Sequence, residues 1–288
     1  MELNTLLQYK PYSTARPEKR ALYAGLLTGL TQFHRERCPE YGRLLDALGC
    51  PDHMDCTVEN TPMLPVSLFK ELELRSIPEG EVFKTLTSSG TTGQRVSRIF
   101  LDGATSACQQ QALCQIMSDF LGERRLPFLV LDSRQVLRNR AMFSARGAGI
   151  LGFSIFGTRP CYALDEHMEL DLDGVRAFLE EHQGETIFLF GFTFIIWKHV
   201  VRALEERGER LDIPNGILVH GGGWKKLAGE AVSPGEFKAR VAAATGVERV
   251  SNYYGMAEQT GCIYMECPQG HLHASLWSDI VVRRGRDY

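Results

Sequence analysis

Residues 186–223 contain the clearest pattern in the chain: "TIFLFG" (186–191) is followed by "FIIWKHVVRALEERG" (194–208) and then by "GILVHGGG" (216–223). The first and third segments are short apolar runs bounded by glycine, which is typical of buried strands. The middle segment has apolar residues at helical spacing. This order of strand, helix and strand predicts a βαβ unit with parallel strands.

The same alternation extends to both sides of this unit. The other predicted strands and helices are "PFLVLD" (127–132), "FSIFG" (153–157), the helical "DGVRAFLEEHQ" (173–183) and "SPGEFKARVAAATG" (233–246), and "RVSNYYG" (249–255). The stretch from residue 261 onward indicates two strands joined by a turn near Pro268 to Gly270. We therefore expect an α/β fold with mixed, partly parallel sheets flanked by helices.

The N-terminal part of the chain has a different pattern. Pro17 to Leu48 carries apolar residues at helical spacing and ends at Gly49, which predicts one or two amphipathic helices. A helical N-terminal region of about 75 residues is expected, within one core that spans residues 1–288. No internal repeat or low-complexity tract interrupts it.

The composition is that of an ordinary globular protein, with 44% hydrophobic and 23% charged residues. A net charge of -3 gives no reason to expect nucleic acid or an anionic membrane as a partner, so a small-molecule ligand is favoured. No secretory signal or membrane span is indicated, which favours the cytoplasm. We interpret most of the eight cysteines as reduced core residues.

Ligands of such sheets bind beyond the carboxyl ends of the strands. The residues that follow the predicted strands are therefore the candidates for a binding site: Asp132 and Ser133, Gly191 to Thr193, His220 to Gly223, and Tyr254 to Glu258.

A glycine-rich loop, "KTLTSSGTTGQR" (84–95), lies between two strand-like segments. It lacks the spacing of a P-loop and of a dinucleotide fingerprint, and no helix follows it directly. Its glycines permit close approach of backbone amides to an anion, and its hydroxyls can donate to phosphate. Two interpretations remain: a plain polar connection between strands, or a phosphate-binding loop in which Arg95 and Arg98 supply positive charge.

The order of residues in "TSSGTTG" resembles the phosphate loop of the adenylate-forming superfamily, and within it the acyl-protein synthetases of the LuxE type are the most similar. Three further stretches carry this resemblance: the N-terminal "RCPEYGRLL" with "LPVSLFKELEL", then "LFGFTFIIW", and finally "SNYYGMAEQTG". Together they cover nearly the whole chain in the order that the family has.

The resemblance implies an ATP-dependent reaction in which a carboxylate attacks the α-phosphate of ATP, giving an acyl-adenylate and pyrophosphate. Fatty acid is the substrate that the family suggests. The residues that would bind ATP are Ser88, Ser89, Gly90, Thr91, Thr92 and Gly93 at the β- and γ-phosphates, Gly221, Gly222 and Gly223 along adenine and the α-phosphate, and Tyr254 and Gly255 near adenine. Arg95 and Arg98 stand where many relatives have lysine, and Glu258 would hold Mg²⁺. Ala257 departs from the pattern, because the superfamily usually has threonine there.

Two further interpretations concern the acid site and a second metal. Gly191, Phe192 and Thr193 are expected to face the acid, whereas Phe194, Trp197 and Val201 have the helical spacing of core residues. Cys262, Cys267, His271 and His273 are close in sequence, and Cys with His is the usual zinc ligand set. The spacing matches no recognised zinc finger, so a zinc site at Cys267, His271 and His273 competes with a plain hairpin.

The family's C-terminal lid and its late acyl-accepting cysteine would begin where "VVRRGRDY" stands, so we expect the lid to be absent from these 288 residues. Three hypotheses on function remain open at this point. The first is acyl transfer to a protein thiol, the second is transfer to coenzyme A, and the third is a non-catalytic nucleotide-binding protein.

Overall fold

The computed structural model describes residues 6–88, 95–138 and 145–284, and these residues form two compact units. The first unit consists of residues 1–119, 255–263 and 274–288, and the second of residues 120–254 and 264–273. Residues 89–94, which include most of the predicted phosphate loop, lie outside the described residues. No described helix is long and apolar enough to cross a membrane.

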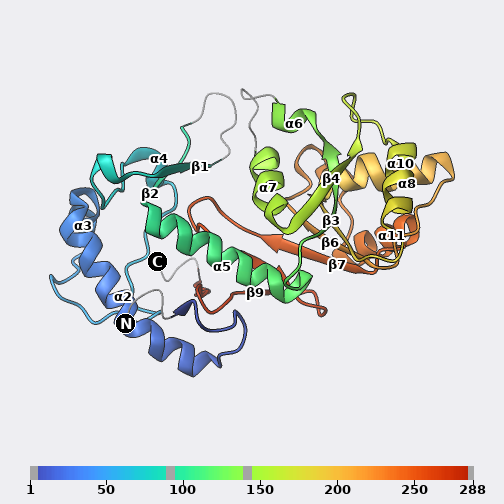
Figure 1. Ribbon diagram of the computed structural model, residues 1–288. Coiled ribbons are helices and arrows are strands. Elements are labelled where there is room, and N and C mark those ends of the chain that lie inside the picture. The colour runs from blue at the N-terminus through green and yellow to red at the C-terminus, as the bar shows by residue number, and fades with distance from the viewer. Residues whose placement is uncertain (1–5, 89–94, 139–144, 285–288) are drawn as a thin grey trace. The chain divides into compact units, whose positions relative to one another are not determined.

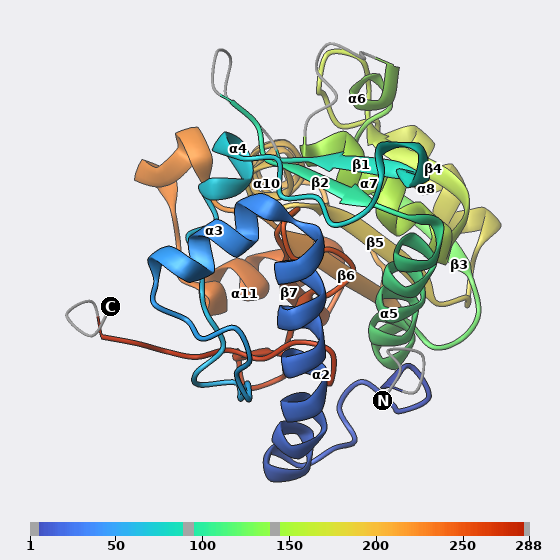
Figure 2. The same ribbon diagram turned by 90° about the vertical axis from the view of Figure 1, so that its left-hand side faces the viewer.

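The first unit is built from helices and one strand pair (Figure 2). Its elements are α2 (Arg16–Arg37), α3 (Pro39–Ala47), α4 (Leu68–Glu71), η1 (Glu79–Glu81), β1 (Lys84–Thr87), β2 (Arg98–Leu101) and α5 (Gly103–Leu121). Proline in the first turn starts both α2 and α3, because its missing N–H would be unpaired there anyway. The helices predicted from Pro17 to Leu48 are thus confirmed.

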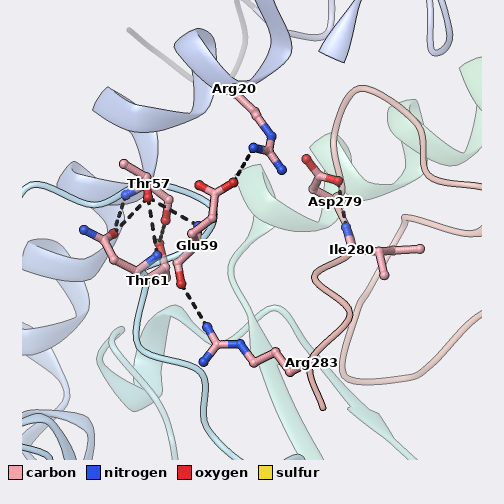
Figure 3. Close-up of polar contacts among 8 residues, drawn as sticks. Arg20, Thr57, Glu59, Thr61, Asp279, Ile280 and Arg283 are labelled. Carbon is pink, nitrogen blue, oxygen red and sulfur yellow. Dashed lines mark hydrogen bonds and ion pairs between the residues drawn. The ribbon is translucent and has the colours of Figure 1, made fainter. Parts of the chain in front are cut away.

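Hydrogen bonds join the C-terminal segment of the first unit to α2. Lys19, which is buried, donates from Nζ to the Ser275 carbonyl at 2.9 Å, and the Tyr23 hydroxyl donates to the Leu276 carbonyl at 2.7 Å. Farther along, Arg283 donates to the Glu59 carbonyl at 2.9 Å while the Glu59 carboxylate pairs with Arg20 (Figure 3). Segments more than 200 residues apart in sequence therefore form one unit.

The second unit contains a sheet in the strand order β4-β3-β5-β6-β7-β8-β9 (Figure 1). The strands are β3 (Leu126–Ser133), β4 (Gly157–Leu164), β5 (Ile187–Phe192), β6 (Gly216–Gly221), β7 (Arg249–Tyr254), β8 (Tyr264–Glu266) and β9 (Leu272–His273). The pairs from β4 to β7 are parallel, and β8 and β9 add antiparallel strands. The predicted α/β class with a mixed, partly parallel sheet is confirmed.

Helices cover both faces of this sheet. The helical elements of this unit are α6 (Gln135–Arg138), α7 (Ala145–Phe153), η3 (Ser154–Phe156), α8 (Leu172–Glu181), α9 (Thr193–Ile195), the π-helical η4 (Ile196–Val201), α10 (Arg202–Arg207), η5 (Lys225–Glu230) and α11 (Pro234–Thr245). On one face, Phe153 of α7 stacks on Phe190 with ring centroids 4.3 Å apart. On the other face, Trp197 of η4 stacks on Phe237 of α11 at 6.2 Å.

All residues of β5 and β6 are buried, as expected for central strands covered on both faces. One strand prediction is wrong: "FSIFG" forms the end of α7 and a 3-10 turn, and β4 begins only at Gly157. Short apolar runs fit a buried helix as well as a strand, and here the run continues a helix. The eight cysteines are all free, but only Cys38 and Cys56 are buried, so the prediction that most are core residues is wrong.

Candidate active site

The carboxyl ends of the three central strands of the second unit lie side by side. In the register of the sheet, Phe192 at the end of β5 pairs with Gly221 of β6, and Gly221 pairs in turn with Tyr253 of β7. The segment 191–193, the loop 221–223 and the end of β7 are therefore neighbours, as the βαβ pattern predicts.

Backbone is exposed in the loop that follows β6. Gly221 is buried, and an added Cβ there would lie 2.4 Å from Cε1 of the Tyr253 ring. Gly222 has a φ of +77°, a left-handed conformation that favours glycine. Gly222 and Gly223 are exposed, and an added Cβ at Gly223 would meet no atom within 4 Å. The loop thus leaves main chain without side chains exposed, which fits the prediction that a flat base lies against it.

An aromatic ring stands beside this loop at the end of β7. Tyr254 is 50% exposed, although it is a large aromatic side chain, and its ring is stacked on Tyr264 at a centroid distance of 6.2 Å. The preceding Tyr253 is turned inward, where its ring contacts Phe153 at 4.9 Å and burial raises the pKa of its hydroxyl. An exposed ring and exposed glycine backbone on neighbouring strands fit the predicted adenine site.

A buried threonine and a buried histidine connect the strand ends. The Thr193 hydroxyl lies 3.0 Å from Nδ1 of His220, 3.2 Å from the Gly221 carbonyl oxygen and 2.8 Å from the Gly222 carbonyl oxygen. Burial, and secondarily the charge of Lys238, lowers the pKa of His220 to about 3. His220 is therefore neutral at physiological pH. The strand-end rule selected both residues, but nothing in the sequence indicated that they contact each other.

Asp132 at the end of β3 forms an ion pair rather than an open ligand site. It is fully buried, and its Oδ2 accepts a hydrogen bond of 2.9 Å from Nε of Arg146, whose Nη2 pairs with Oδ1. The fork of the guanidinium matches the carboxylate. The sequence predicts that Asp132 lies at the end of a strand, but no pattern in it predicts that Arg146 is the partner.

The strands flanking the predicted phosphate loop are confirmed. In the first unit β1 and β2 form an antiparallel pair from Lys84 opposite Leu101 to Thr87 opposite Arg98. Ser88 extends the ladder by one step, since its N–H donates to the Ser97 carbonyl at 3.3 Å and its hydroxyl accepts from the Ser97 N–H at 3.0 Å. The predicted ligands Ser89, Gly90, Thr91, Thr92 and Gly93 lie outside the described residues.

The two arginines beyond this loop differ in their surroundings. Nη2 of Arg98 lies 3.7 Å from the Glu73 carboxylate, which also accepts a hydrogen bond from Arg75 at 3.0 Å. Arg95 is exposed and makes no hydrogen bond or ion pair with any residue that the structure describes. Among the residues that the structure describes, an acidic partner therefore distinguishes Arg98 from Arg95.

The segment that carries Gly255 and Glu258 is fixed to α5 within the first unit. The Gln109 amide donates to the Thr260 hydroxyl, and Gly261, with a φ of +77°, lies so close to Gln109 that an added Cβ would be 2.7 Å from its Cα. Glu258 itself is half-buried. The Thr260 hydroxyl is thus engaged by Gln109.

No group of three or more metal-binding side chains exists among the residues that the structure describes. Cys267, His271 and His273 belong to the β8–β9 hairpin, where the Cys267 N–H donates to the His271 carbonyl at 2.9 Å, as in a plain hairpin. The zinc site at these three residues stays a prediction. A single carboxylate such as Glu258 fits Mg²⁺, which usually takes its remaining ligands from phosphate and water.

Comparison with known proteins completes these observations. The long-chain-fatty-acid–luciferin-component ligase of Vibrio harveyi is 22% identical over 233 residues, which are 79% of this chain and 59% of that protein. A crystal structure of 2-hydroxyisobutyryl-CoA ligase in the postadenylation state matches 90% of this chain and 54% of its own, with a TM-score of 0.57 and 15% identity, a likeness of fold alone. The chain thus spans little more than half the length of these proteins. A family model described as acyl-protein synthetase, LuxE, matches residues 2–287, and the chain belongs to this family.

Proposed function

We propose that this chain binds ATP, Mg²⁺ and a carboxylic acid and activates the acid as an acyl-adenylate for transfer to a protein thiol. The observation that carries the proposal is the register of β5, β6 and β7. It brings the apolar segment 191–193, the exposed glycines 222–223 and the exposed Tyr254 ring to one edge of a sheet. A fatty acid is the proposed substrate, because the ligase of Vibrio harveyi carries that name.

In this reaction a carboxylate oxygen bonds to the α-phosphorus as the bond from that phosphorus to the pyrophosphate oxygen breaks. The obstacle is repulsion between two anions, so a site gains most from fixed positive charge and N–H donors aimed at the phosphates. We assign adenine to the exposed backbone of Gly222 and Gly223 with the Tyr254 ring. We assign phosphate binding to Arg95 and to the loop of residues 88–93.

Mg²⁺, when bound, would neutralise phosphate charge, and Glu258 is the carboxylate that we assign to it. The segment of Glu258 is held on α5 by Gln109, so the carboxylate is presented from an anchored loop rather than from a free one. Gly255 precedes this segment, and we assign it to nucleotide binding as well.

Acid-dependent exchange of labelled pyrophosphate into ATP tests the proposal. We expect exchange that requires Mg²⁺, that is highest with long-chain fatty acids, and that falls in Glu258→Gln. Arg95→Ala should weaken ATP binding, measured by titration calorimetry, by at least about ten-fold, which is 1.4 kcal/mol. Arg98→Ala is the matched control and should change the affinity for ATP by less than about three-fold, because Glu73 already pairs with Arg98.

Three outcomes would count against parts of the proposal. Absence of ATP binding at millimolar concentration would refute nucleotide binding altogether. ATP binding without exchange for any acid would refute acid activation and favour a non-catalytic nucleotide-binding protein. Exchange followed by acyl transfer to coenzyme A, and not to protein thiols, would refute the protein acceptor.

A further inference from the structure

The Thr193 hydroxyl is placed to hold the loop 221–223 rather than to contact a substrate. Thr193 is only 7% exposed, and its oxygen has three partners within 3.2 Å, all of them on residues 220–222. A hydroxyl has one hydrogen and two lone pairs, so these contacts use most of what it offers. Little hydrogen-bonding capacity is left for an acid.

The direction of each hydrogen bond follows from the chemistry of the partners. Carbonyl oxygens only accept, so the Thr193 hydrogen points at a carbonyl, and the Gly222 oxygen at 2.8 Å is the nearer of the two. The Thr193 oxygen then faces Nδ1 of His220 with a lone pair. Nδ1 must therefore carry the hydrogen and donate it, which assigns the Nδ1–H tautomer to this buried ring.

These bonds join two segments with different proposed ligands. Thr193 begins the helix after β5, next to Phe192, which we propose to lie near the acid, whereas Gly222 lies in the loop assigned to adenine. The Phe192 ring is also packed against this loop, since an added Cβ at Gly222 would lie 3.1 Å from its Cδ1. Movement of Thr193 or Phe192 by a bound acid would therefore act directly on the Gly222 backbone.

We propose that Thr193 and His220 form a positioning pair that holds the loop 221–223 in its nucleotide-binding conformation and couples acid binding to ATP binding. This inference rests on the proposed function. It reassigns Thr193 from a substrate-facing residue to one that acts through the Gly222 carbonyl. His220 supplies the second support, from the strand that leads into the loop.

Two substitutions of Thr193 distinguish the role of its hydroxyl from the role of the rest of its side chain. Thr193→Val removes the hydroxyl and leaves the Gly222 carbonyl and His220 Nδ1 without their partner, whereas Thr193→Ser keeps it. We expect Thr193→Val to weaken ATP binding by about ten-fold or more and Thr193→Ser to stay within about two-fold of the wild type. With a long-chain fatty acid present, the acid's effect on ATP affinity should be smaller in Thr193→Val than in Thr193→Ser.

Thr245→Val is the matched control. Thr245 is also buried, at 3% exposure, and its hydroxyl donates to the Val241 carbonyl at 2.7 Å, but it lies at the end of α11, just before β7 begins. Thr245→Val should lower the free energy of unfolding in urea about as much as Thr193→Val does. The affinity for ATP, and the effect of the acid on that affinity, should stay as in the wild type. Equal ATP affinity in Thr193→Val and Thr245→Val would overturn the inference.

Nitrogen chemical shifts of His220 give a test that needs no nucleotide. The Thr193–His220 pair is supported if Nδ1 carries the hydrogen in the wild type and this state is lost or altered in Thr193→Val. The pair is refuted if the wild type carries the hydrogen on Nε2 and none on Nδ1. Absence of ATP binding in the wild type would instead refute the proposed function, so the two failures are distinguishable.

Discussion

Gly221→Ala tests the packing of the loop that follows β6. The new Cβ would lie 2.4 Å from Cε1 of Tyr253 and 2.8 Å from Cδ1 and Cζ, whereas carbon atoms in contact are about 3.5 Å apart. The Tyr253 ring must therefore retreat by about 1 Å. Behind it stand the rings of Phe153 and Phe190, with centroids at 4.9 and 6.1 Å, so the retreat strains the core.

Overpacking of this kind costs about 1–3 kcal/mol. Gly223→Ala is the control, because its Cβ would meet no atom within 4 Å and its φ is not in the left-handed region. Both changes remove the same backbone freedom from the unfolded chain, so the difference between them isolates the steric cost. We expect Gly221→Ala to unfold in urea with a free energy about 1–3 kcal/mol below that of Gly223→Ala and with the same m-value.

Two results bear on this reasoning. If the two alanine variants differ by less than about 0.3 kcal/mol, Tyr253 does not confine Gly221 and the described geometry of the loop is wrong. In a Tyr253→Leu background, the penalty of Gly221→Ala should largely disappear, because the ring that the methyl group meets is gone. ATP binding, measured separately, should weaken in Gly221→Ala if the loop binds nucleotide.

Two further predictions concern the buried charge at the end of β3 and the buried histidine of β6. Arg146→Ala leaves the fully buried Asp132 unpaired and should lower the free energy of unfolding by about 3–5 kcal/mol, with a smaller loss when Asp132→Asn is added. His220 titrates at about 3 when folded and near 6.5 when unfolded, so the unfolded state binds more protons between these values and stability falls as the pH is lowered below about 6.5. Between pH 7 and pH 5, the free energy of unfolding of the wild type should fall by about 2 kcal/mol more than that of His220→Gln. An equal fall for the two proteins, measured by urea unfolding at both pH values, would contradict this.

The sequence predicts the sheet well because the physical cause is local. Central strands covered on both faces are apolar at nearly every position, and "TIFLFG" and "GILVHG" are long enough to show this. The strand-end rule then predicts that the segments Gly191 to Thr193 and His220 to Gly223 lie at one edge of the sheet, and the register of β5 and β6 places them there. The wrong strand at "FSIFG" shows the limit, since a five-residue run with three large apolar side chains fits the end of a helix equally well.

What the sequence did not predict depends on residues that meet only in the fold. Asp132 and Arg146 are fourteen residues apart and carry no pattern of their own, yet they form the buried ion pair at the end of β3. Arg95 and Arg98 look equivalent in sequence, but Glu73 pairs with only one of them. Partner choice of this kind follows from tertiary position and not from spacing.

The contacts of Thr193 show why a residue at a strand end need not face the ligand. Three strands end side by side at this edge, and each leaves backbone groups that the sheet no longer pairs. A ligand can satisfy some of these groups, but the Gly221 and Gly222 carbonyls must be held before it arrives if the loop is to keep its shape. The Thr193 hydroxyl donates to the Gly222 carbonyl at 2.8 Å, with the Gly221 carbonyl oxygen 3.2 Å away, and Nδ1 of His220 on the next strand lies 3.0 Å from the same hydroxyl. We therefore propose that the residues of such an edge divide into those that contact ligand and those that hold the contacting backbone. Exposure would separate the two here, since Gly222, Gly223 and Tyr254 are exposed while Thr193 and His220 are buried.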